Sequence, residues 1–331
     1  MANATLRRVV TEIATDQEAI MKSLEKKSGI LMSALADESS HGHFHKYKMV
    51  DALPSFAWYS AGGSLTDQTV NDVVKQLDLK NVGAIQSEPK EVAETFPGGV
   101  IPFFEKQFPA FIEAFGQEAS KGIIYGYNSA FGKVNGIKGF HQIVNDAIRT
   151  DSMNSNVNYI NETGASGSTT SIFAVTWSDS SCKLLFDGQA TRTEGQFLEV
   201  LPLGDGKPIA EVTNTGTGAK KITYQVLYTA RLALLSASYL DIAAYRRIQD
   251  SSGHVPIAKN MDLLLDLVHA DSTSTVLYMN RTSKRLLGEL KDSKLSTFVV
   301  DRNYDTVVEL WNGIKIIIDD NIVDNEDTTL E

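Results

Sequence analysis

The sequence predicts a protein of the α+β class, and three observations support this class. Phenylalanines recur at helical spacing through residues 101–125, which predicts a helix with one aromatic face. Apolar and polar residues alternate through much of the C-terminal half, where residues 222–234 are predicted to form one long strand. Strands and helices do not alternate in repeated βαβ units, so a doubly wound nucleotide-binding sheet is not expected.

Length and composition indicate an ordinary globular protein of about two domains. The 331 residues are 42% hydrophobic and 22% charged. No segment reaches the roughly 18 apolar residues of a membrane span, and the N-terminus lacks the apolar core of a signal peptide. The single cysteine, Cys182, cannot form an internal disulfide, and we expect it to be a small apolar residue in a strand. The net charge of −10 argues against sequence-specific nucleic-acid binding, which requires clustered Lys and Arg.

The N-terminal third is predicted to bury little of its own surface. Residues 5–36 carry a thin apolar stripe typical of a helix that Gly29 ends or bends, and this helix could pack on a partner. A polar, aromatic-rich stretch then leads to a turn at Gly62-Gly63, and residues 64–90 are predicted to be extended. Because an isolated two-stranded ribbon is at best marginal in water, we expect a neighbour to hold it.

The helix predicted at residues 101–125 should use its aromatic stripe as a packed core face rather than as a cofactor site. Pro102 suits a first helical turn, whereas Pro109 should kink or restart the helix. Residues 151–170 are dominated by Asn, Ser, Thr and Gly and are predicted to be a loop or a domain junction. The residues expected on the buried face of the helix are Phe104, Phe108, Phe111 or Ile112, Phe115 and Ala119.

Two strands and two helices are predicted around the long strand. Residues 172–177 and 182–186 flank a Ser-Asp-Ser-Ser turn, which favours a hairpin. Ser238 and Asp241 fit a capping box that opens a helix over 238–248. Asn260 is predicted to cap a second helix whose inward residues are Met261, Leu264, Leu265 and Val268.

The C-terminal part begins with a strand at 276–279 that runs into a helix opened by Asn280 and Thr282. The segment VVELW-Asn312-Gly313-IKIII is the strongest hairpin signal in the chain, because Asn-Gly favours a two-residue turn. Residues 319–331 hold six acids and no base, and we interpret them as a solvated charged end. They lack the glycine and the terminal glutamate of a calcium-binding loop.

The sequence assigns no catalytic, cofactor-binding or metal-binding residue. Phosphate-binding loops and the nucleophile elbow are absent, and no acids or histidines have the spacing of paired acid–base catalysis. Alternate residues of a strand share a face, so His41, His43 and His45 could converge on zinc. Lys46 and Lys48 would repel a cation there, so a polar extended arm is the favoured interpretation.

Six segments, in order along nearly the whole chain, resemble the major capsid proteins of short-tailed (podovirus-like) tailed bacteriophages. Residues 191–221 and the Ser/Asn-rich loop follow no pattern that we can match to that family. The six segments are LEKKSGILMSALADESSHGHFHKYKMVDALPSFAWYSAGG, AFIEAFGQEASKGIIYGYNSAFGKVNGIKGF, SIFAVTW, YQVLYTARLALLSASYLDIAAYRRI, LYMNRTSKRLL and LWNGIKIIIDDNI.

The resemblance implies the capsid fold of the Hong Kong ninety-seven type, with an N-terminal arm, a protruding β-hairpin called the E-loop, a peripheral domain with a long spine helix, and an axial domain. The sequence match leaves the domain membership of 301–331, the C-terminal hairpin and acidic tail, open. The expected ranges are 1–54 for the arm, 55–90 for the E-loop, 91–125 for the peripheral domain and 126–300 for the axial domain.

The same resemblance implies a structural protein and no enzyme. Its subunits would self-assemble into hexamers and pentamers of an icosahedral shell that encloses double-stranded DNA without sequence specificity. Scaffolding, decoration and portal proteins would be further partners, no cofactor or membrane would be involved, and the protein would be in the virion, after assembly in the host cytoplasm. Some relatives form Lys–Asn cross-links; Lys75 and Lys80 lie in the expected E-loop, but no partner asparagine is identified and we do not expect cross-linking.

Two alternatives remain open at this point. An encapsulin-like cellular compartment would share the fold but enclose cargo enzymes, and the DNA content of purified particles would separate it from a phage shell. A monomeric metal-binding module or hydrolase would use His41, His43 and His45 and would be a soluble monomer with bound zinc.

Overall fold

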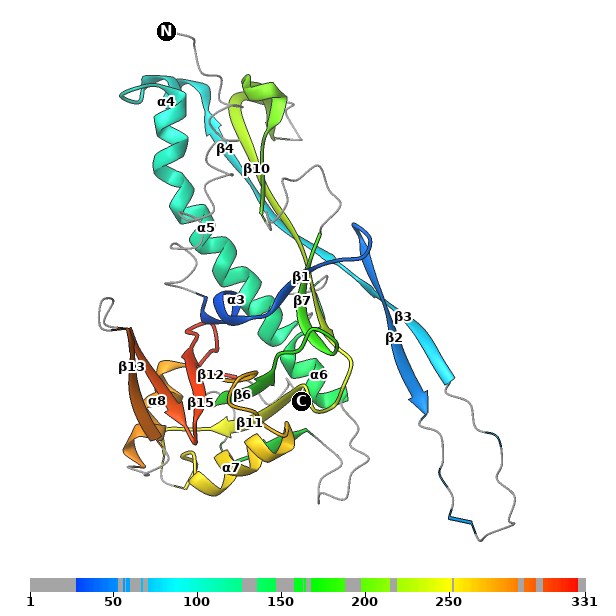
Figure 1. The fold of residues 1–331 in the computed structure, drawn as a ribbon. Helices are drawn as coiled ribbons and strands as arrows, with labels where there is room; N and C mark the ends of the chain where they lie inside the picture. Colours follow the sequence, from blue (N-terminus) through cyan, green and yellow to red (C-terminus); the bar gives the residue numbers. More distant parts are fainter. Residues whose placement is uncertain are drawn as a thin grey trace.

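The structure is a computed structural model of the chain (Figure 1). It describes residues 28–52, 56, 58–59, 67, 71–126, 136–146, 158–162, 164, 168–187, 198–214, 219–251, 253–290, 295–301 and 306–326.

Two sheets and one long helix, α5 (Val100–Tyr125), form the body of the molecule (Figure 1). The first sheet lies along α5, and its longest strand, β10, pairs with four others. A short helix, α4 (Lys90–Thr95), joins this sheet to α5. The six strands are β1 (Ala36–Glu38), β4 (Lys80–Pro89), β7 (Cys182–Phe186), β8 (Glu199–Pro202), β9 (Ile209–Asn214) and β10 (Ala219–Ser236), with a 3₁₀ turn, η2 (Leu203–Gly206), between β8 and β9.

Strand β10 and helix α5 share one hydrophobic core, which joins the buried faces that the sequence predicted for each of them separately. The even-numbered side chains of β10 from 226 to 232 pack with the aromatic stripe of α5, and Phe111 stacks on Tyr228 with ring centroids 4.8 Å apart. The helix is continuous, so the restart expected at Pro109 is wrong. Pro109 lies on the exposed side, where water can reach the carbonyl group that loses its hydrogen bond. The predicted stripe is buried at Phe104, Phe108, Ile112, Phe115 and Ala119.

The second sheet has seven strands and is covered on both faces. One face packs against α7 (Ala258–Leu267) and α8 (Arg281–Glu289), and the other against α6 (Phe140–Asp146) and the C-terminal end of α5. Strand β6 contributes alternate side chains to the two cores. The strand order is β13 (Leu295–Asp301), β14 (Thr306–Trp311), β15 (Ile314–Ile318), β12 (Thr275–Met279), β6 (Thr170–Thr176), β11 (Ile242–Ile248) and β5 (Tyr159–Asn161).

The helix predicted over 238–248 is wrong, because this segment contains strand β11. Both faces of β11 are buried, and the spacing of its apolar residues Ile242, Ala243, Ala244 and Ile248 fits a helix as well as an interior strand. Ser238 and Asp241 do interact, since the Ser238 N–H donates to the Asp241 carboxylate at 2.8 Å. The bond closes a turn between β10 and β11 instead of starting a helix.

The hairpin predicted for residues 172–177 and 182–186 is also wrong. Strand β6 pairs with β11 and β12 in the seven-stranded sheet, whereas β7 pairs with β1 and β10 in the other. Only an isolated bridge between Ser178 and Cys182 links the two strands. Cys182 is buried in β7, as expected, and burial raises the pKa of its thiol well above the usual range.

Several element boundaries depend on capping groups. Asn280 caps α8 as predicted, because its side-chain oxygen accepts the Ser283 N–H at 2.8 Å. Asn260 does not cap α7; it lies inside the helix and donates to Glu162 at 2.8 Å. Gly29 begins the short helix α3 (Gly29–Ser33), which is capped by Ser28. The earlier part of the predicted N-terminal helix and the Gly62-Gly63 turn lie outside the described residues.

The Asn312-Gly313 turn between β14 and β15 confirms the predicted hairpin. Both residues have positive φ, 50° and 83°, as a two-residue type I′ turn requires. The structure also places this hairpin, whose domain membership the sequence left open, in the seven-stranded sheet next to β12.

Substituting the turn glycine by alanine should destabilise the subunit. Gly313→Ala is expected to lower the free energy of unfolding by about 1–2 kcal/mol, because a Cβ disfavours positive φ even though the site is open. Gly122→Ala is the matched control: Gly122 is an open helical position in α5, and alanine there should raise stability by up to about 1 kcal/mol. Denaturant unfolding of unassembled subunits, followed by circular dichroism, measures both; equal effects would contradict the turn geometry.

Candidate interaction surface

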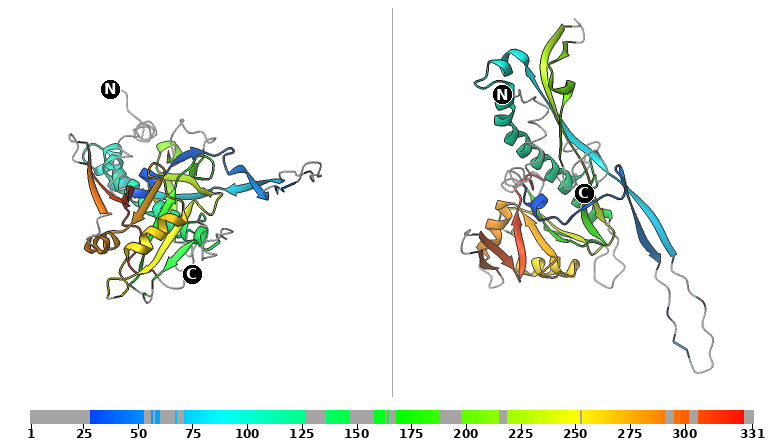
Figure 2. Two further views of the ribbon diagram at one scale, coloured as in Figure 1. Left: turned by 60° about the horizontal axis from the view of Figure 1, so that its bottom comes forward. Right: turned by 45° about the horizontal axis from the view of Figure 1, so that its top comes forward.

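A two-stranded ribbon projects from the body of the molecule (Figures 1 and 2). Strands β2 (Phe44–Ala52) and β3 (Asn71–Asp78) pair antiparallel, with Phe44 opposite Asp78. Only Leu79 separates β3 from β4, so the chain passes from the ribbon directly into the six-stranded sheet. The extended conformation predicted for 64–90 is confirmed over 71–89, apart from this one residue.

A small apolar cluster anchors the base of the ribbon. Leu79 packs with Leu185, Ala233 and Leu235 of the sheet, and Tyr47 and Leu77 pack against this cluster. Beyond the base the ribbon is open to solvent: none of the described side chains from Val73 to Asp78 is buried, and Val74 is 59% exposed. The expectation of little burial, made for residues 64–90, holds for the described side chains of 73–78, whereas Lys80–Pro89 form strand β4 of the six-stranded sheet.

Three aromatic residues between β2 and β3 are exposed. Phe56 is 96% exposed, Trp58 105% and Tyr59 is also exposed. Large aromatic side chains in water are a free-energy cost for a single subunit, and they are typical anchors of protein interfaces. We call Phe56, Trp58 and Tyr59 the aromatic tip.

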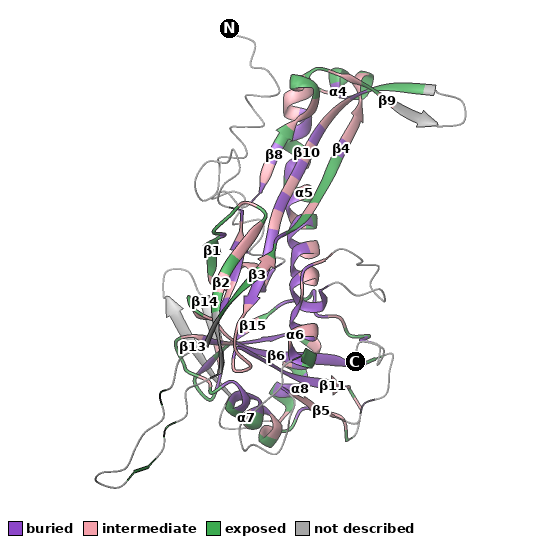
Figure 3. Ribbon diagram, turned by 90° about the vertical axis from the view of Figure 1, so that its right-hand side faces the viewer, coloured by how far each residue is buried: buried purple, intermediate pink, exposed green. Residues whose placement is uncertain are grey.

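An apolar row crosses the face of the six-stranded sheet that points away from α5. Ile85 of β4 and Leu201 of β8 both lie opposite Leu227 of β10. Ile85 and Leu201 are exposed and Leu227 is half-buried, whereas the neighbouring Val226 and Tyr228 face α5. In Figure 3, buried and intermediate positions follow one another along β10, and much of β4 is exposed. We call Ile85, Leu227 and Leu201 the sheet row.

Two of the histidines at the start of the ribbon contact neighbouring residues. The His41 ring stacks on Phe44 with centroids 4.5 Å apart, and the His45 Nδ1 accepts the Ser40 N–H at 3.1 Å. Burial, with the nearby Lys183 charge, lowers the pKa of His45. Within the described part of the chain, no three His, Cys, Asp or Glu side chains are grouped to hold a metal ion. The metal-binding alternative, which would use His41, His43 and His45, therefore gains no support.

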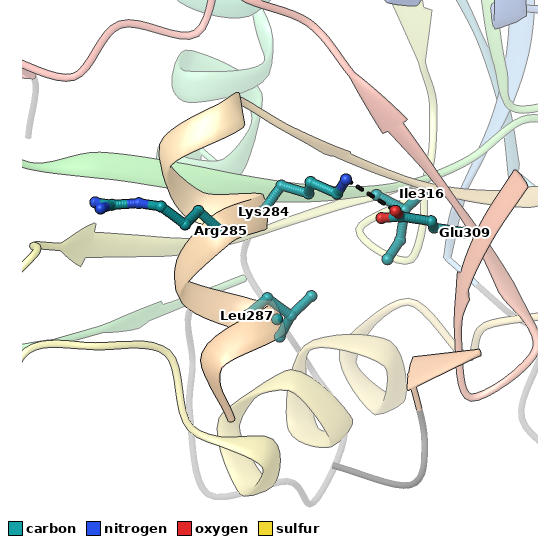
Figure 4. Close-up of a pocket in the computed structure, with 6 residues that line it drawn as sticks. Lys284, Arg285, Leu287, Glu309 and Ile316 are labelled. Carbon is teal, nitrogen blue, oxygen red and sulfur yellow. Dashed lines mark ion pairs between the residues drawn. The ribbon is translucent and has the colours of Figure 1, made fainter. Parts of the chain in front are cut away.

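A pocket of about 370 Å³ lies between α8 and the β14–β15 hairpin (Figure 4). An ion pair of 2.8 Å joins Lys284 Nζ and Glu309 Oε1, and Leu287 and Ile316 supply apolar lining. The charged groups of the lining are paired, Lys284 with Glu309 and Arg285 with Asp250. None of the described helices is long and apolar enough to cross a membrane.

Two acids of the C-terminal segment, Asp319 and Glu326, are buried, so the interpretation of a solvated charged end is wrong for these two, whereas Asp320 and Asp324 are exposed. Asp319 is buried and accepts the Ile30 N–H at 3.0 Å, which connects the end of β15 to α3. Glu326 is buried at the end of α5, where the Tyr125 hydroxyl donates to it at 2.8 Å. The sequence carries one signal of this burial, the apolar pair Ile322-Val323 between the acids.

The comparisons with known proteins agree with this architecture. The family model described as "Major capsid protein GP7" matches residues 14–191, more than half of the chain. The chain belongs to this family. No curated protein sequence matches significantly.

Two solved phage capsids show the same fold as this GP7-family protein. The near-atomic structure of bacteriophage epsilon15 is similar to it with a TM-score of 0.56 and 13% identity, covering 89% of this chain and 87% of the other. The bacteriophage JBD30 capsid gives a TM-score of 0.50 and 10% identity, covering 90% and 91%. The fold is that of the Hong Kong ninety-seven type, which confirms the predicted fold class.

Membership of the GP7 family fixes the general role of the protein. It is a structural subunit of a phage capsid shell, its place is the virion, and its role is not enzymatic. The sequence resemblance to tailed-phage major capsid proteins is confirmed. The encapsulin-like and metal-dependent alternatives have no support.

Removing the Asn280 side chain should destabilise the subunit strongly. Asn280 is buried, caps α8, and donates to Thr170 Oγ1 at 2.9 Å and to Asp324 Oδ1 at 2.6 Å. Asn280→Ala is expected to cost about 2–3 kcal/mol, because it leaves several buried groups without partners. Thr282→Ala, which removes only an exposed bond to Asp324, should cost less than about 0.5 kcal/mol. Urea unfolding measures both, and similar costs would disprove the role of Asn280.

Proposed function

We propose that this capsid protein self-assembles into hexamers and pentamers of an icosahedral shell that encloses double-stranded DNA. The observation that carries the proposal is the ribbon, which extends a solvent-exposed β-hairpin and an aromatic tip away from the subunit body. A surface of this kind gains stability only when another protein covers it.

The ribbon would act as the E-loop, and the sheets support a division of the chain into the expected parts. Because β2 begins at Phe44, the E-loop would include the end of the range expected for the arm, 1–54, as well as much of 55–90. The peripheral domain would combine α5 with the six-stranded sheet, which includes β7 to β10 from within the 126–300 range. The seven-stranded sheet would be the axial domain, together with the C-terminal hairpin.

The ribbon would dock on a second copy of the chain. The sheet row offers an exposed apolar face on a rigid sheet, and the aromatic tip offers the complementary side chains. Obligate interfaces of this kind bury on the order of 2,000–5,000 Å² in total. Many moderate contacts made at once would stabilise a closed shell through multivalency.

The packaged DNA would be held without sequence specificity. The net charge of −10 disfavours tight adhesion of the shell wall to phosphates. Scaffolding, decoration and portal proteins would complete the particle, assembly would take place in the host cytoplasm, and no membrane would take part.

Self-assembly is tested with the full-length recombinant chain. Size-exclusion chromatography and negative-stain imaging should show closed shells or capsomers in exchange with subunits. Nuclease-protected double-stranded DNA in particles from infected cells would support the genome-enclosing role, whereas particles filled with cargo enzyme would contradict it.

The aromatic tip gives the sharpest variant. Trp58→Ala should reduce the yield of particles at least tenfold, because it removes an interface anchor. It should leave the unfolding of the free subunit unchanged within about 0.5 kcal/mol, because Trp58 is fully exposed there.

Leu263→Ala is the matched control, since Leu263 is an exposed apolar residue of α7, away from the ribbon. Sedimentation of assembly reactions measures particle yield for both variants and the wild type. Normal yield with Trp58→Ala, or an equal loss with Leu263→Ala, would refute the role of the tip.

A further inference from the structure

A buried carboxyl group fastens the C-terminal segment to the joint between the two halves of the molecule. Glu326 is only 5% exposed, and its carboxyl group accepts hydrogen bonds from the Tyr125 hydroxyl of α5 and the Ser171 hydroxyl of β6. The Glu326 N–H donates to the Thr169 carbonyl oxygen at 2.9 Å, and the Thr169 hydroxyl donates to the Glu326 carbonyl oxygen at 2.8 Å. The Tyr125 hydroxyl also accepts the Val323 N–H at 2.9 Å, so the segment is fixed at two points.

The other end of the segment is fastened in a similar way. Asp319 accepts the N–H groups of Ile30 and Asn321 at 3.0 and 2.9 Å, and the Ser120 hydroxyl of α5 donates to it. Residues 319–326 therefore connect α3, α5 and the seven-stranded sheet through buried acids. We call these residues the C-terminal latch.

The charges and hydroxyl groups around Glu326 do not cancel the effect of burial on the pKa of its carboxyl group. Burial raises its pKa to about 7, although the Ser171 and Tyr125 hydroxyls and the Arg246 guanidinium of β11 act in the opposite direction. Asp324, in the latch itself, raises it further.

The nearest imidazole supplies no positive charge. His141 of α6 has its Nε2 3.9 Å from Glu326 Oε1, and neither ring nitrogen makes a hydrogen bond. Burial, reinforced by Arg246, holds the pKa of His141 well below its usual range, so the ring is neutral wherever Glu326 is ionised.

We propose that the charge on Glu326 controls the C-terminal latch: the latch is closed when this carboxyl group is protonated, and ionisation favours its release from the joint between α5 and the seven-stranded sheet. This device lies within one subunit and goes beyond the proposed function, because it does not depend on how subunits contact each other.

The direction of the pH effect follows from the two states of Glu326. Its pKa is about 7 in the closed latch and 4.5 in water, so the stabilisation is fully present below 4.5 and is lost as the pH rises through 7. The equilibrium constant for opening should rise up to about tenfold per pH unit between these values, and by about 300-fold in all. Burial also raises the pKa of Asp319, which adds an effect in the same direction.

His141 would give latch opening the opposite pH dependence to that of Glu326. If opening exposes its ring, protonation of the open state favours opening as the pH falls below 6.5. A test must therefore separate Glu326 from its neighbours, and the variant Glu326→Gln does so because it keeps the shape of the side chain without its titration.

Hydrogen exchange of the full-length, unassembled chain, read by mass spectrometry from pH 5 to pH 8, measures latch opening. Dividing the wild-type exchange rate by that of Glu326→Gln at each pH cancels the intrinsic pH dependence and the contributions of His141 and Asp319. The ratio should rise by about 70-fold between pH 5 and pH 8 and level off above pH 7, while amides of α7 show no such change. The reporting amides, all bonded in the closed latch, are those of Asp319, Asn321, Ile322, Val323 and Glu326.

A ratio that stays constant within about threefold would overturn the proposal. Ser171→Ala provides a second test should Glu326→Gln not fold. The Ser171 hydroxyl is a donor that stabilises the carboxylate more than the neutral acid, so its loss should affect opening mainly where Glu326 is ionised. The factor by which Ser171→Ala increases opening should therefore be at least about fivefold larger at pH 8 than at pH 5. An equal increase at the two pH values would also overturn it. Neither result depends on particle formation, so failure here is distinct from failure of the assembly proposal.

Discussion

The packing of α5 on β10 is the interaction on which the rest of the structure depends. The aromatic stripe of the helix and the even-numbered side chains of the strand form one continuous core. Burial of each large side chain contributes roughly 1.5–3 kcal/mol, which fixes the helix along the strand. The C-terminal residues of the same helix, Ile123 to Tyr125, enter the core of the seven-stranded sheet. One rigid helix therefore sets the relative position of both sheets.

The same framework gives the ribbon its direction. Because β4 pairs with β10 along ten residues and continues through Leu79 into β3, the ribbon extends a strand that is fixed in the sheet. Its outer part gains nothing from the core of its own subunit, and its aromatic tip is in water. A GP7-family subunit thus combines a stable body with a projection whose apolar surface is uncovered, as expected of a part that is completed by its neighbours.

The C-terminal latch buries acidic rather than apolar side chains. Asp319 and Glu326 are placed where α3, α5 and the seven-stranded sheet meet, and hydroxyl and amide donors partly compensate for their loss of water. A buried carboxyl group with a raised pKa stabilises the contact between two elements more when it is protonated than when it is ionised. We therefore infer that the stability of the joint between the two halves depends on the charge of these two groups.

The sequence by itself determined the elements whose signals are local. Helical spacing of phenylalanines located α5, and apolar residues at alternate positions located β10. Asn280 and Asn312-Gly313 marked a helix start and a hairpin turn through bonds to residues close in sequence. The exposed state of the ribbon also followed from its low apolar content.

Only the tertiary structure decided which strands pair and which charges are buried. A strand covered on both faces, such as β11, has the same apolar spacing as a helix, and only its partners β5 and β6 decide between them. Alternation could not assign β6 and β7 to separate sheets, because pairing depends on residues far apart in the sequence. The acids at 319 and 326 resemble a solvated tail, and their burial depends on donors from Ile30, Tyr125 and Ser171, which lie 155 to 289 residues away. Local patterns specify conformation, whereas burial and pairing are properties of the assembled core.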